Sequence, residues 1–301
     1  MIDFNATPVM KDGIARFVEA DNYADSFGFQ WNRFAATQLD REQKGSSGSS
    51  VRFWAETGWD RQALKGVNIL EAGSGAGRFS QVILTESEAN LHSFDYSNAV
   101  DANLKSNGAI APERFQLSQA SIYDIPYPDD SFDKVVCLGV LQHTPDFEES
   151  VRALVRKARL GGEIVVDFYE IRNLFTKIHA KYLLRPISKR IDDEKLLNLI
   201  DRHADRLMRL YRGLGKMGLA PLRRFIPVAD FEGPYPKTLS EKQMREWVVL
   251  DTFDMMSPEH DHPQRIGSVA KMMERAGADV TFAGHVDNGS GTAAVVRAVK
   301  R

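Results

Sequence analysis

The chain has 301 residues and a mass of 33.8 kDa, which suits two domains or one large domain with an insertion. Hydrophobic residues make up 43% and charged residues 27%, and no apolar run reaches transmembrane length, which excludes a disordered, collagenous or membrane-spanning chain. The 39 basic and 41 acidic residues give a net charge of -2, so the chain as a whole does not attract nucleic acid or anionic lipid. The first residues lack a secretory signal, so we expect a cytoplasmic protein.

Residues 1–50 are predicted to form an N-terminal arm. The pair Asp12-Gly13 favours a tight hairpin turn, and residues 45–50 (GSSGSS) predict a flexible connection. Between them, the aromatic stretch from Phe27 to Phe34 includes Trp31. Two interpretations stay open for these rings: a lid that closes over a bound cofactor, or packing within the arm.

Strands alternate with helices over the next hundred residues. Apolar runs predict strands, and apolar residues at helical spacing predict helices. The predicted strands are 67–72, 91–94, 134–140 and 163–169; the predicted helices are 79–87, 99–106 and 147–160, the last of them stopped by Gly161-Gly162. This alternation predicts an α/β fold with a parallel sheet covered on both faces.

The alternation breaks after residue 171, where Leu, Ile and Met recur at helical spacing among many Lys and Arg. It resumes with a helix at 263–276 and strands at 279–283 and 293–299, whose short link requires an antiparallel pair. We therefore expect four parts: the arm at 1–50, a cofactor-binding core at 51–171, a helical insertion at 172–250, and the C-terminal part of the core at 251–301. The arm and the insertion are predicted to form the acceptor pocket or a lid.

The insertion is basic, because the segment from Lys181 to Phe225 has 12 basic and 5 acidic residues. Three explanations stay open. Its Lys and Arg residues solvate the outer faces of amphipathic helices, or arginines hold a phosphate or carboxylate of the acceptor, or the segment binds nucleic acid. The last is disfavoured, because aromatic residues are few there. The arginines proposed for the second role are Arg185, Arg190, Arg223 and Arg224.

The segment EAGSGAG, from Glu71 to Gly77, lies between a predicted strand and a predicted helix. A dinucleotide fingerprint would need a glycine at position 78, where this chain has Arg78. The spacing instead resembles motif I of the class I S-adenosylmethionine-dependent methyltransferases. That resemblance implies a Rossmann-like fold with a mostly parallel sheet, an antiparallel last strand, and S-adenosyl-L-methionine as the cofactor.

The resemblance also implies the cofactor-binding residues. Asp95 ends the second predicted strand, where the family carries an acidic residue for both ribose hydroxyls, and a carboxylate offers two acceptor oxygens to such a diol. Ser121 occupies a position where relatives often have Asp for the adenine, a departure that leaves the backbone of Ile122 for this contact. The implied cofactor-binding set is Glu71, Gly73, Gly75, Gly77, Asp95, Tyr96, Ser121, Ile122, Leu138 and Trp31.

Two histidines are candidates for a general base. His143 follows the strand at 134–140, on the rim where open α/β sheets bind ligands, and His262 lies before the helix at 263–276. Structural interpretations stay open: His143 bonding loop backbone, and Asp261 capping the helix next to His262. Asp167 is expected to cap a neighbouring backbone. With one cysteine, Cys137, and no helical pair of ligands, we expect neither a disulfide nor a metal site.

Segments on the flanks resemble bacterial methyltransferases of surface-polysaccharide and secondary-metabolite pathways; they are 12–18, 27–40 and 250–264. We therefore expect a methyltransferase that acts on oxygen or nitrogen of a small-molecule or glycan acceptor, such as a nucleotide-linked sugar. Two alternatives stay open, a cofactor-binding partner protein without turnover and an NAD-dependent oxidoreductase. A homodimer is also left open.

Overall fold

The computed structural model describes residues 1–19, 24, 26–28, 30, 48–172, 176, 178–232, 239–289 and 291–301. Its contacts divide the chain into two compact units. The first comprises residues 1–170 and 260–301, and the second comprises residues 171–259.

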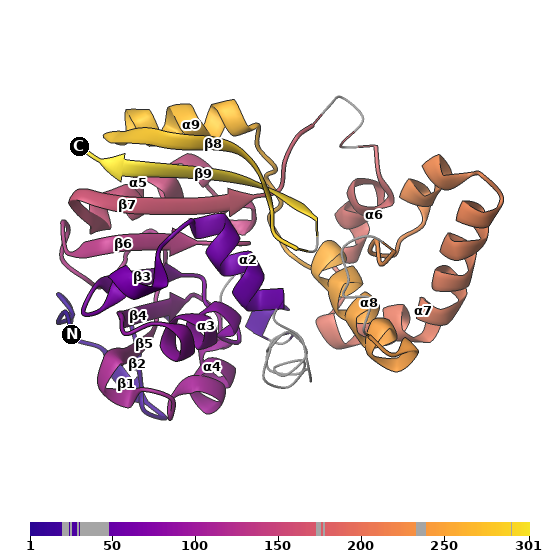
Figure 1. Ribbon diagram of the computed structural model, residues 1–301. Coiled ribbons are helices and arrows are strands. Elements are labelled where there is room, and N and C mark those ends of the chain that lie inside the picture. Colours follow the sequence, from indigo (N-terminus) through magenta and orange to yellow (C-terminus); the bar gives the residue numbers. More distant parts are fainter. Residues whose placement is uncertain are drawn as a thin grey trace. The chain divides into compact units, whose positions relative to one another are not determined.

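The first unit is built on a sheet of nine described strands in the order β1-β2-β5-β4-β3-β6-β7-β9-β8 (Figure 1). The pairs from β2 through to β7 are parallel, whereas β1 with β2, β7 with β9, and β9 with β8 are antiparallel. The strands are β1 (Val9–Lys11), β2 (Ile14–Arg16), β3 (Asn68–Ala72), β4 (Asn90–Asp95), β5 (Phe115–Gln119), β6 (Phe132–Cys137), β7 (Ala158–Phe168), β8 (Ala278–Asp287) and β9 (Thr292–Lys300). The predicted α/β fold and its antiparallel last strand are confirmed.

Helices cover both faces of this sheet (Figure 1). On one face, Phe53, Phe79 and Ile83 belong to an apolar cluster with the sheet; on the other face, Val151 and Met273 do so. The helices of this unit are α2 (Gly48–Thr57), η2 (Arg61–Leu64), α3 (Arg78–Glu86), α4 (Val100–Asn107), η3 (Pro112–Arg114), η4 (Leu141–His143), α5 (Phe147–Lys157) and α9 (Ile266–Arg275). The first cluster packs α2 and α3, and the second packs α5 and α9.

The predicted hairpin at Asp12-Gly13 is present, with positive φ angles of 53° and 80° at these two residues. Its second strand, β2, pairs in parallel with β5. Arg16 fixes this end of the sheet, since Nη1 donates to Gln119 Oε1 at 2.6 Å and Nη2 contacts Asp101 Oδ1 at 2.6 Å. The start of the arm therefore extends the sheet.

In the middle of the chain one strand of the first unit was missed, and one predicted helix end was wrong. β5 was not predicted, because only Phe115 and Leu117 of its five residues are apolar. The helix predicted to reach Leu160 ends at Lys157, and β7 begins at Ala158. Gly161-Gly162 therefore lies inside a strand. Phe132 of β6 pairs with Ala158 of β7, and Lys134 pairs with Glu163, so the register shifts at the two glycines.

Further boundaries differ from the predictions. Of the segment predicted to be flexible, residues 48–50 form the first turn of α2, where Ser50 Oγ donates to Glu86 Oε2 at 2.9 Å. β8 extends to Asp287, and β9 extends by one residue at each end beyond the predicted 293–299. α9 begins at Ile266 with Arg265 as its N-cap, so Asp261 does not cap it.

The second unit is mostly helical, as predicted. Its helices are α6 (Ala180–Ser188), α7 (Asp193–Lys216), η5 (Ala220–Phe225) and α8 (Glu241–Met256). Asp192 caps α7, and Ser240 and Gln243 form a capping box on α8. None of the helices in the described part of the chain is long and apolar enough to cross a membrane.

Two of the four arginines proposed to hold an anion are engaged inside this unit. Arg185 Nη2 donates to the Pro258 carbonyl at 2.6 Å, and Arg223 Nη2 contacts Glu232 Oε2 at 2.6 Å. Both guanidinium groups are therefore already bound to groups of the protein within this unit.

We expect Gly162→Ala to lower the free energy of unfolding by about 1–3 kcal/mol. An added Cβ would lie 2.9 Å from the carbonyl oxygens of both Arg159 and Phe132. Gly161→Asn is the matched control, because Gly161 has a φ of 74°, which Asn tolerates, and because, apart from the adjoining residues, no described atom lies within 4 Å of an added Cβ. Urea titration compares the two variants, and equal destabilisation would contradict this close approach within β7.

Candidate functional site

The motif residues lie at one edge of the sheet. β3, β4, β5, β6 and β7 are parallel, so their carboxyl ends share an edge. The loop after β3 is fixed to the end of β4, because the N–H groups of Gly73 and Ser74 both donate to the Phe94 carbonyl, at 2.8 and 3.0 Å. Crevices at this edge are where open α/β sheets bind ligands.

The glycines of this loop all have positive φ angles: 77° at Gly73, 51° at Gly75 and 88° at Gly77. At Gly73 an added Cβ would overlap Val140, from the loop after β6. At Gly77 it would overlap Asn103, from α4. The bare backbone at Gly73 and Gly77 therefore lets neighbouring parts of the protein pack against the loop.

Glu71 lies beneath the loop, where it is 3% exposed. Its Oε2 accepts hydrogen bonds from Ser80 Oγ at 2.5 Å and from Ser93 Oγ at 2.7 Å. Burial raises the pKa of Glu71 to about 7, although the two hydroxyls favour the charged form. This carboxyl holds β3, β4 and α3 together.

A chain of side-chain amides continues this network to α4. Asn103 Nδ2 donates to Ser80 Oγ at 3.0 Å, and Asn107 Nδ2 donates to the Gly77 carbonyl at 2.8 Å. The amides also bond each other at 2.9 Å. The glycine loop is thus fixed from below by buried polar contacts.

Asp95 ends β4 and points its carboxylate at the glycine loop. Oδ2 accepts the Gly75 N–H at 2.8 Å, and Oδ1 accepts the Ser97 N–H and hydroxyl at 2.8 and 2.7 Å. Burial raises the pKa of Asp95, against these hydrogen bonds. Tyr96, which is half-buried, offers its carbonyl to Gln119 Nε2 at 3.1 Å.

The other predicted cofactor residues are partly used within the protein. Ser121 Oγ accepts the Tyr123 N–H at 3.2 Å, which stabilises a turn. The side chains of Ile122 and Leu138 are buried in the two apolar clusters. Only the backbone of these two residues is therefore suited to polar contacts with a ligand. Trp31 lies outside the described residues.

His143 lies in an aromatic group beside the glycine loop. It is 7% exposed, and its N–H donates to the carbonyl of Val140, the residue that packs on Gly73. Nδ1 donates to the His260 carbonyl at 3.1 Å, so Nε2 of the neutral ring is the basic nitrogen. The rings of Phe27 and Tyr169 lie 5.0 and 5.5 Å from it, centroid to centroid.

His262 comes close to the same loop through its backbone. Its N–H donates to the Gln142 carbonyl at 2.7 Å, and its exposed ring stacks on His260 at 5.7 Å. The structure therefore brings the two candidate bases to one region. The described residues hold no group of three His, Cys, Asp or Glu side chains suited to a metal ion.

An ion pair that the sequence analysis missed lies at the end of β7. Asp167 Oδ1 accepts the Gly139 N–H, which confirms that it caps a neighbouring backbone, and Oδ2 contacts Arg52 Nη2 at 2.6 Å. Arg52 also binds Glu56 Oε1 at 2.9 Å, and burial together with Asp167 raises the pKa of Glu56. Helix α2 is thereby attached to the loop after β6. Sequence spacing gave no signal for this contact across 115 residues.

Two more residues were missed, Ser74 in the glycine loop and Gln142 next to His143. They are 6% and 0% exposed. The Ser74 hydroxyl and both polar atoms of the Gln142 amide are buried, and none of them has a hydrogen-bond partner among the residues that the structure describes. Buried groups of this kind are costly unless a ligand satisfies them. Their position in motif loops was the available signal.

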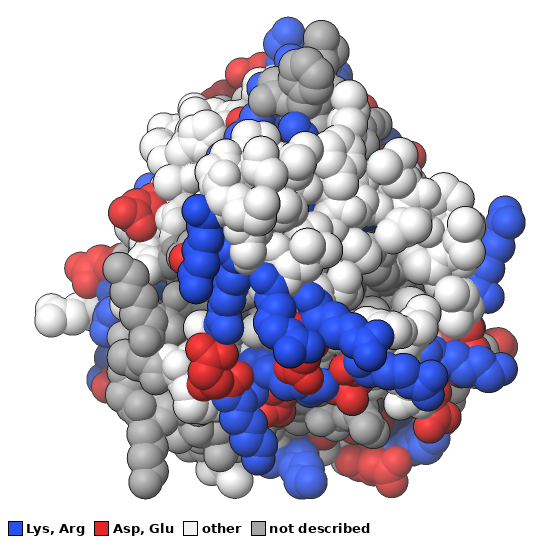
Figure 2. Space-filling model, turned by 90° about the vertical axis from the view of Figure 1, so that its right-hand side faces the viewer, with Lys and Arg blue, Asp and Glu red and all other residues white. Residues whose placement is uncertain are grey.

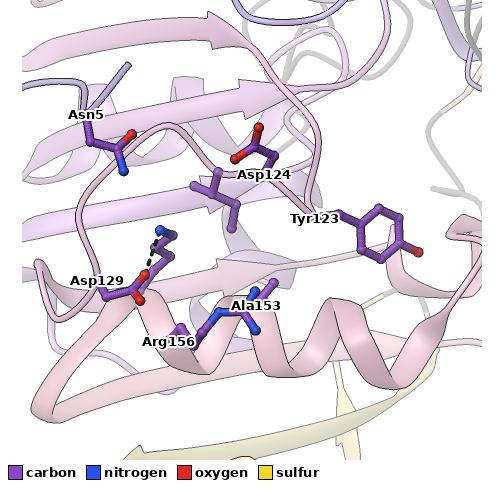
Figure 3. Close-up of a pocket in the computed structure, with 8 residues that line it drawn as sticks. Asn5, Tyr123, Asp124, Asp129, Ala153 and Arg156 are labelled. Carbon is purple, nitrogen blue, oxygen red and sulfur yellow. Dashed lines mark hydrogen bonds and ion pairs between the residues drawn. The ribbon is translucent and has the colours of Figure 1, made fainter.

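A cavity of about 370 Å³ lies elsewhere, between the loop before β6 and α5 (Figure 3). It is lined by Asn5, Tyr123, Asp124, Ile125, Asp129, Ala153, Arg156 and Lys157. Lys157 Nζ and Asp129 Oδ1 form an ion pair of 2.7 Å within it. None of the predicted site residues that the structure describes lines this cavity.

Comparison with known proteins identifies part of the chain. Residues 70–166 match the Methyltransferase domain family. A ubiquinone/menaquinone biosynthesis C-methyltransferase of Vibrio parahaemolyticus is 26% identical over 153 residues, 48% of this chain and 54% of that protein. A ubiquinone biosynthesis O-methyltransferase of Alkalilimnicola ehrlichii is 27% identical over 162 residues, 50% of this chain and 65% of that protein. The chain thus spans less than two thirds of either relative.

A solved structure is similar over most of the chain. It is the magnesium protoporphyrin IX methyltransferase of Synechocystis PCC 6803 with bound SAH. The two sequences are 14% identical, the TM-score is 0.49, and the match covers 93% of this chain and 97% of the other chain.

The buried Glu71 predicts a pH-dependent stability. Because its pKa rises from about 4.5 in the unfolded chain to about 7, its contribution is complete below pH 4.5 and is lost as the pH rises through 7. The loss is on the order of 3 kcal/mol. We expect Glu71→Gln, whose amide oxygen still accepts from both serines, to remove this loss in urea titrations at pH 5 and pH 8. Glu88→Gln, at an exposed position, is the control. If the Glu71 variant kept the pH dependence of the unaltered chain, the buried carboxyl would not be its source.

Proposed function

We propose that this chain, whose residues 70–166 form a class I methyltransferase domain, transfers the methyl group of S-adenosylmethionine to an oxygen or nitrogen of a small-molecule acceptor. The observation that carries the proposal is the hydrogen bond between Asp95 and the Gly75 N–H, which sets a carboxylate against the glycine loop at the carboxyl edge of a parallel sheet. The cofactor supplies an activated methyl group on a sulfonium.

The residues of the site suit the nucleoside part of this cofactor. Asp95 is half-buried, and its carboxylate is directed at the loop. Oδ2 accepts one hydrogen bond, from the Gly75 N–H, so a ribose hydroxyl bound there would meet an oxygen that can accept a second. Gly75 provides backbone without a side chain in the same place. We assign the ribose to Asp95 and the adenine to the backbone around Ile122.

The amino-acid part of the cofactor suits the Ser74 hydroxyl and the Gln142 amide, which are buried and have no hydrogen-bond partner in the described part of the chain. The amide of Gln142 can both accept from an ammonium group and donate to a carboxylate, and the Ser74 hydroxyl can donate to a carboxylate. Both residues lie in loops that pack together through Val140 and Gly73. We assign the methionine moiety to this region.

The acceptor is assigned to the aromatic group around His143. A hydroxyl acceptor must lose its proton as the methyl group is transferred, and Nε2 of His143 would take that proton. The ring is held by the His260 carbonyl at Nδ1 and by Phe27 and Tyr169 on its sides. These aromatic neighbours favour an aromatic acceptor.

The relatives named for C- and O-methylation in ubiquinone biosynthesis support a small-molecule acceptor. Neither relative supports the glycan acceptor considered from the sequence. Incubation with labelled cofactor and a panel of phenols, aromatic amines and nucleotide sugars tests the assignment. Label on a phenol or amine is expected; label on nucleotide sugars alone would contradict an aromatic acceptor, and no label on any compound would favour a protein that binds the cofactor without turnover.

Asp95→Asn should weaken binding of S-adenosylhomocysteine about five- to a hundredfold, since an amide offers one acceptor oxygen where the carboxylate offers two. Isothermal titration calorimetry measures the affinity. Asp124→Asn, an exposed carboxylate on the cavity described above, is the matched control and should bind as the unaltered chain does. Equal affinity in both variants would remove Asp95 from the site.

His143→Gln should lower the methylation rate about a hundredfold or more while leaving S-adenosylhomocysteine affinity unchanged, because a general base acts only on the transfer step. His262→Gln is the comparison, since this exposed histidine is the second candidate base. Rates measured from pH 6 to pH 9 separate the two. A loss confined to the His262 variant would reverse the assignment, and full activity in both would exclude a histidine base.

A further inference from the structure

Helix α6 of the second unit presents its apolar side chains to the outside. Leu183, Leu184 and Ile187 are 61%, 40% and 65% exposed, and Ile178, just before the helix, is 44% exposed. The three helix residues share one face, because they are spaced at i, i+1 and i+4. A helix that contributes to a protein core buries such a face.

The polar side of α6 is instead directed inward. Arg185 is 7% exposed, and its Nη2 donates to the Pro258 carbonyl at 2.6 Å; Ser188 Oγ donates to the Met256 carbonyl at 2.8 Å. These carbonyls lie at and just beyond the C-terminal end of α8, where helix carbonyls lack intrahelical partners and a cation is favoured. The orientation of α6 is therefore set by this polar contact, which directs the apolar face outward.

Cations border the exposed apolar face. Lys189 and Arg190 lie two and three residues after Ile187 and are exposed, and the Arg190 N–H donates to the Ile187 carbonyl at 3.0 Å. The sequence has no acidic residue from 178 to 191. In Figure 2, which looks onto the side where α6, α7 and α8 are drawn in Figure 1, Lys and Arg side chains gather in a band beside uncharged surface.

Further apolar residues are exposed in the same unit. In η5, Leu222 and Phe225 are 46% and 49% exposed, on either side of two arginines. Among the described residues, ten of the sixteen exposed large hydrophobic residues lie in the second unit, which is the smaller one. Exposed apolar surface at this density indicates an interaction site.

We propose that the α6 surface, made of Ile178, Leu183, Leu184, Ile187, Lys189 and Arg190, binds the interface of an anionic phospholipid bilayer. An amphipathic helix of this kind lies in the plane of the membrane, with its apolar side chains among the acyl chains and its cations at the lipid phosphates. The segment from Lys181 to Phe225 has 12 basic and 5 acidic residues, and this local positive charge complements the negative charge of the lipid phosphates, although the whole chain carries -2.

A second copy of the chain is a poorer occupant of this surface. In a two-fold symmetric contact both partners would present the same cationic patch, and neither patch would supply the opposite charge. The described acidic residues nearest in sequence to this surface belong to the start of α7, where Asp192 is the N-cap and Asp193 is the first helical residue. The charge of the surface therefore favours an anionic partner.

Sedimentation with vesicles tests the proposal on the full chain. The unaltered protein should sediment with vesicles of phosphatidylcholine and phosphatidylglycerol, and at least about tenfold less with phosphatidylcholine alone. The double variant Leu183→Glu/Ile187→Glu should bind the anionic vesicles at least about tenfold more weakly. The double variant Lys189→Glu/Arg190→Glu should also bind more weakly, and its loss relative to the unaltered chain should be larger at low salt than at high salt.

Leu160→Glu is the matched control, because Leu160 is 67% exposed and lies on β7 of the first unit. It should bind vesicles as the unaltered chain does. All variants are compared by circular dichroism and by S-adenosylhomocysteine affinity, which the α6 substitutions should leave unchanged. Absent binding to anionic vesicles, binding that survives the α6 substitutions, or an equal loss in Leu160→Glu would each overturn the proposal. A concentration-dependent dimer that the double variant abolishes, without vesicle binding, would assign the surface to a second copy instead.

Discussion

The architecture of the site depends on one constraint, a loop of backbone held between two neighbouring strands. The Phe94 carbonyl at the end of β4 accepts two successive N–H groups from the loop after β3, and Asp95, the next residue, accepts a third. Because β3 and β4 are in parallel register, these contacts form only when both strands are in place. The proposed contacts with a ligand all depend on the position of this loop.

Buried polar groups, rather than apolar packing, hold the loop from beneath. A carboxyl, two serine hydroxyls and two asparagine amides link β3, β4, α3 and α4, and the last amide reaches back to Gly77. Such a buried network is stable only when each polar group has its hydrogen-bond partner, so it favours a single arrangement of these elements. On the far side, the ion pair of Arg52 with Asp167 does the same for α2 and β7.

The sequence was most informative where one local rule decided the structure. Glycines at 73, 75 and 77, between an apolar run and a helical pattern, predicted the loop and the parallel fold, and Asp12-Gly13 predicted the hairpin. It was least informative where a partner lies far along the chain. Spacing could not indicate that Asn107 satisfies Gly77, that Arg52 pairs with Asp167, or that Gly162 packs inside a strand against Phe132. α6 shows the same limit: its helical pattern was visible, but a contact of Arg185 with a residue 73 positions later decided which face is exposed.

The order of strands also bears on how the protein acquires its structure during synthesis. β9, residues 292–300, lies between β7 and β8, and Arg297 donates to the carbonyls of Ala55 and Glu56 at the end of α2. A ribosome delivers the glycine loop and all six parallel strands, β2 to β7, long before it delivers this strand. Until then one edge of β7 stays unpaired and open to other extended chains. The nascent protein therefore carries its assembled ligand loop beside an unfinished sheet, which makes this interval the time when a chaperone would protect it most.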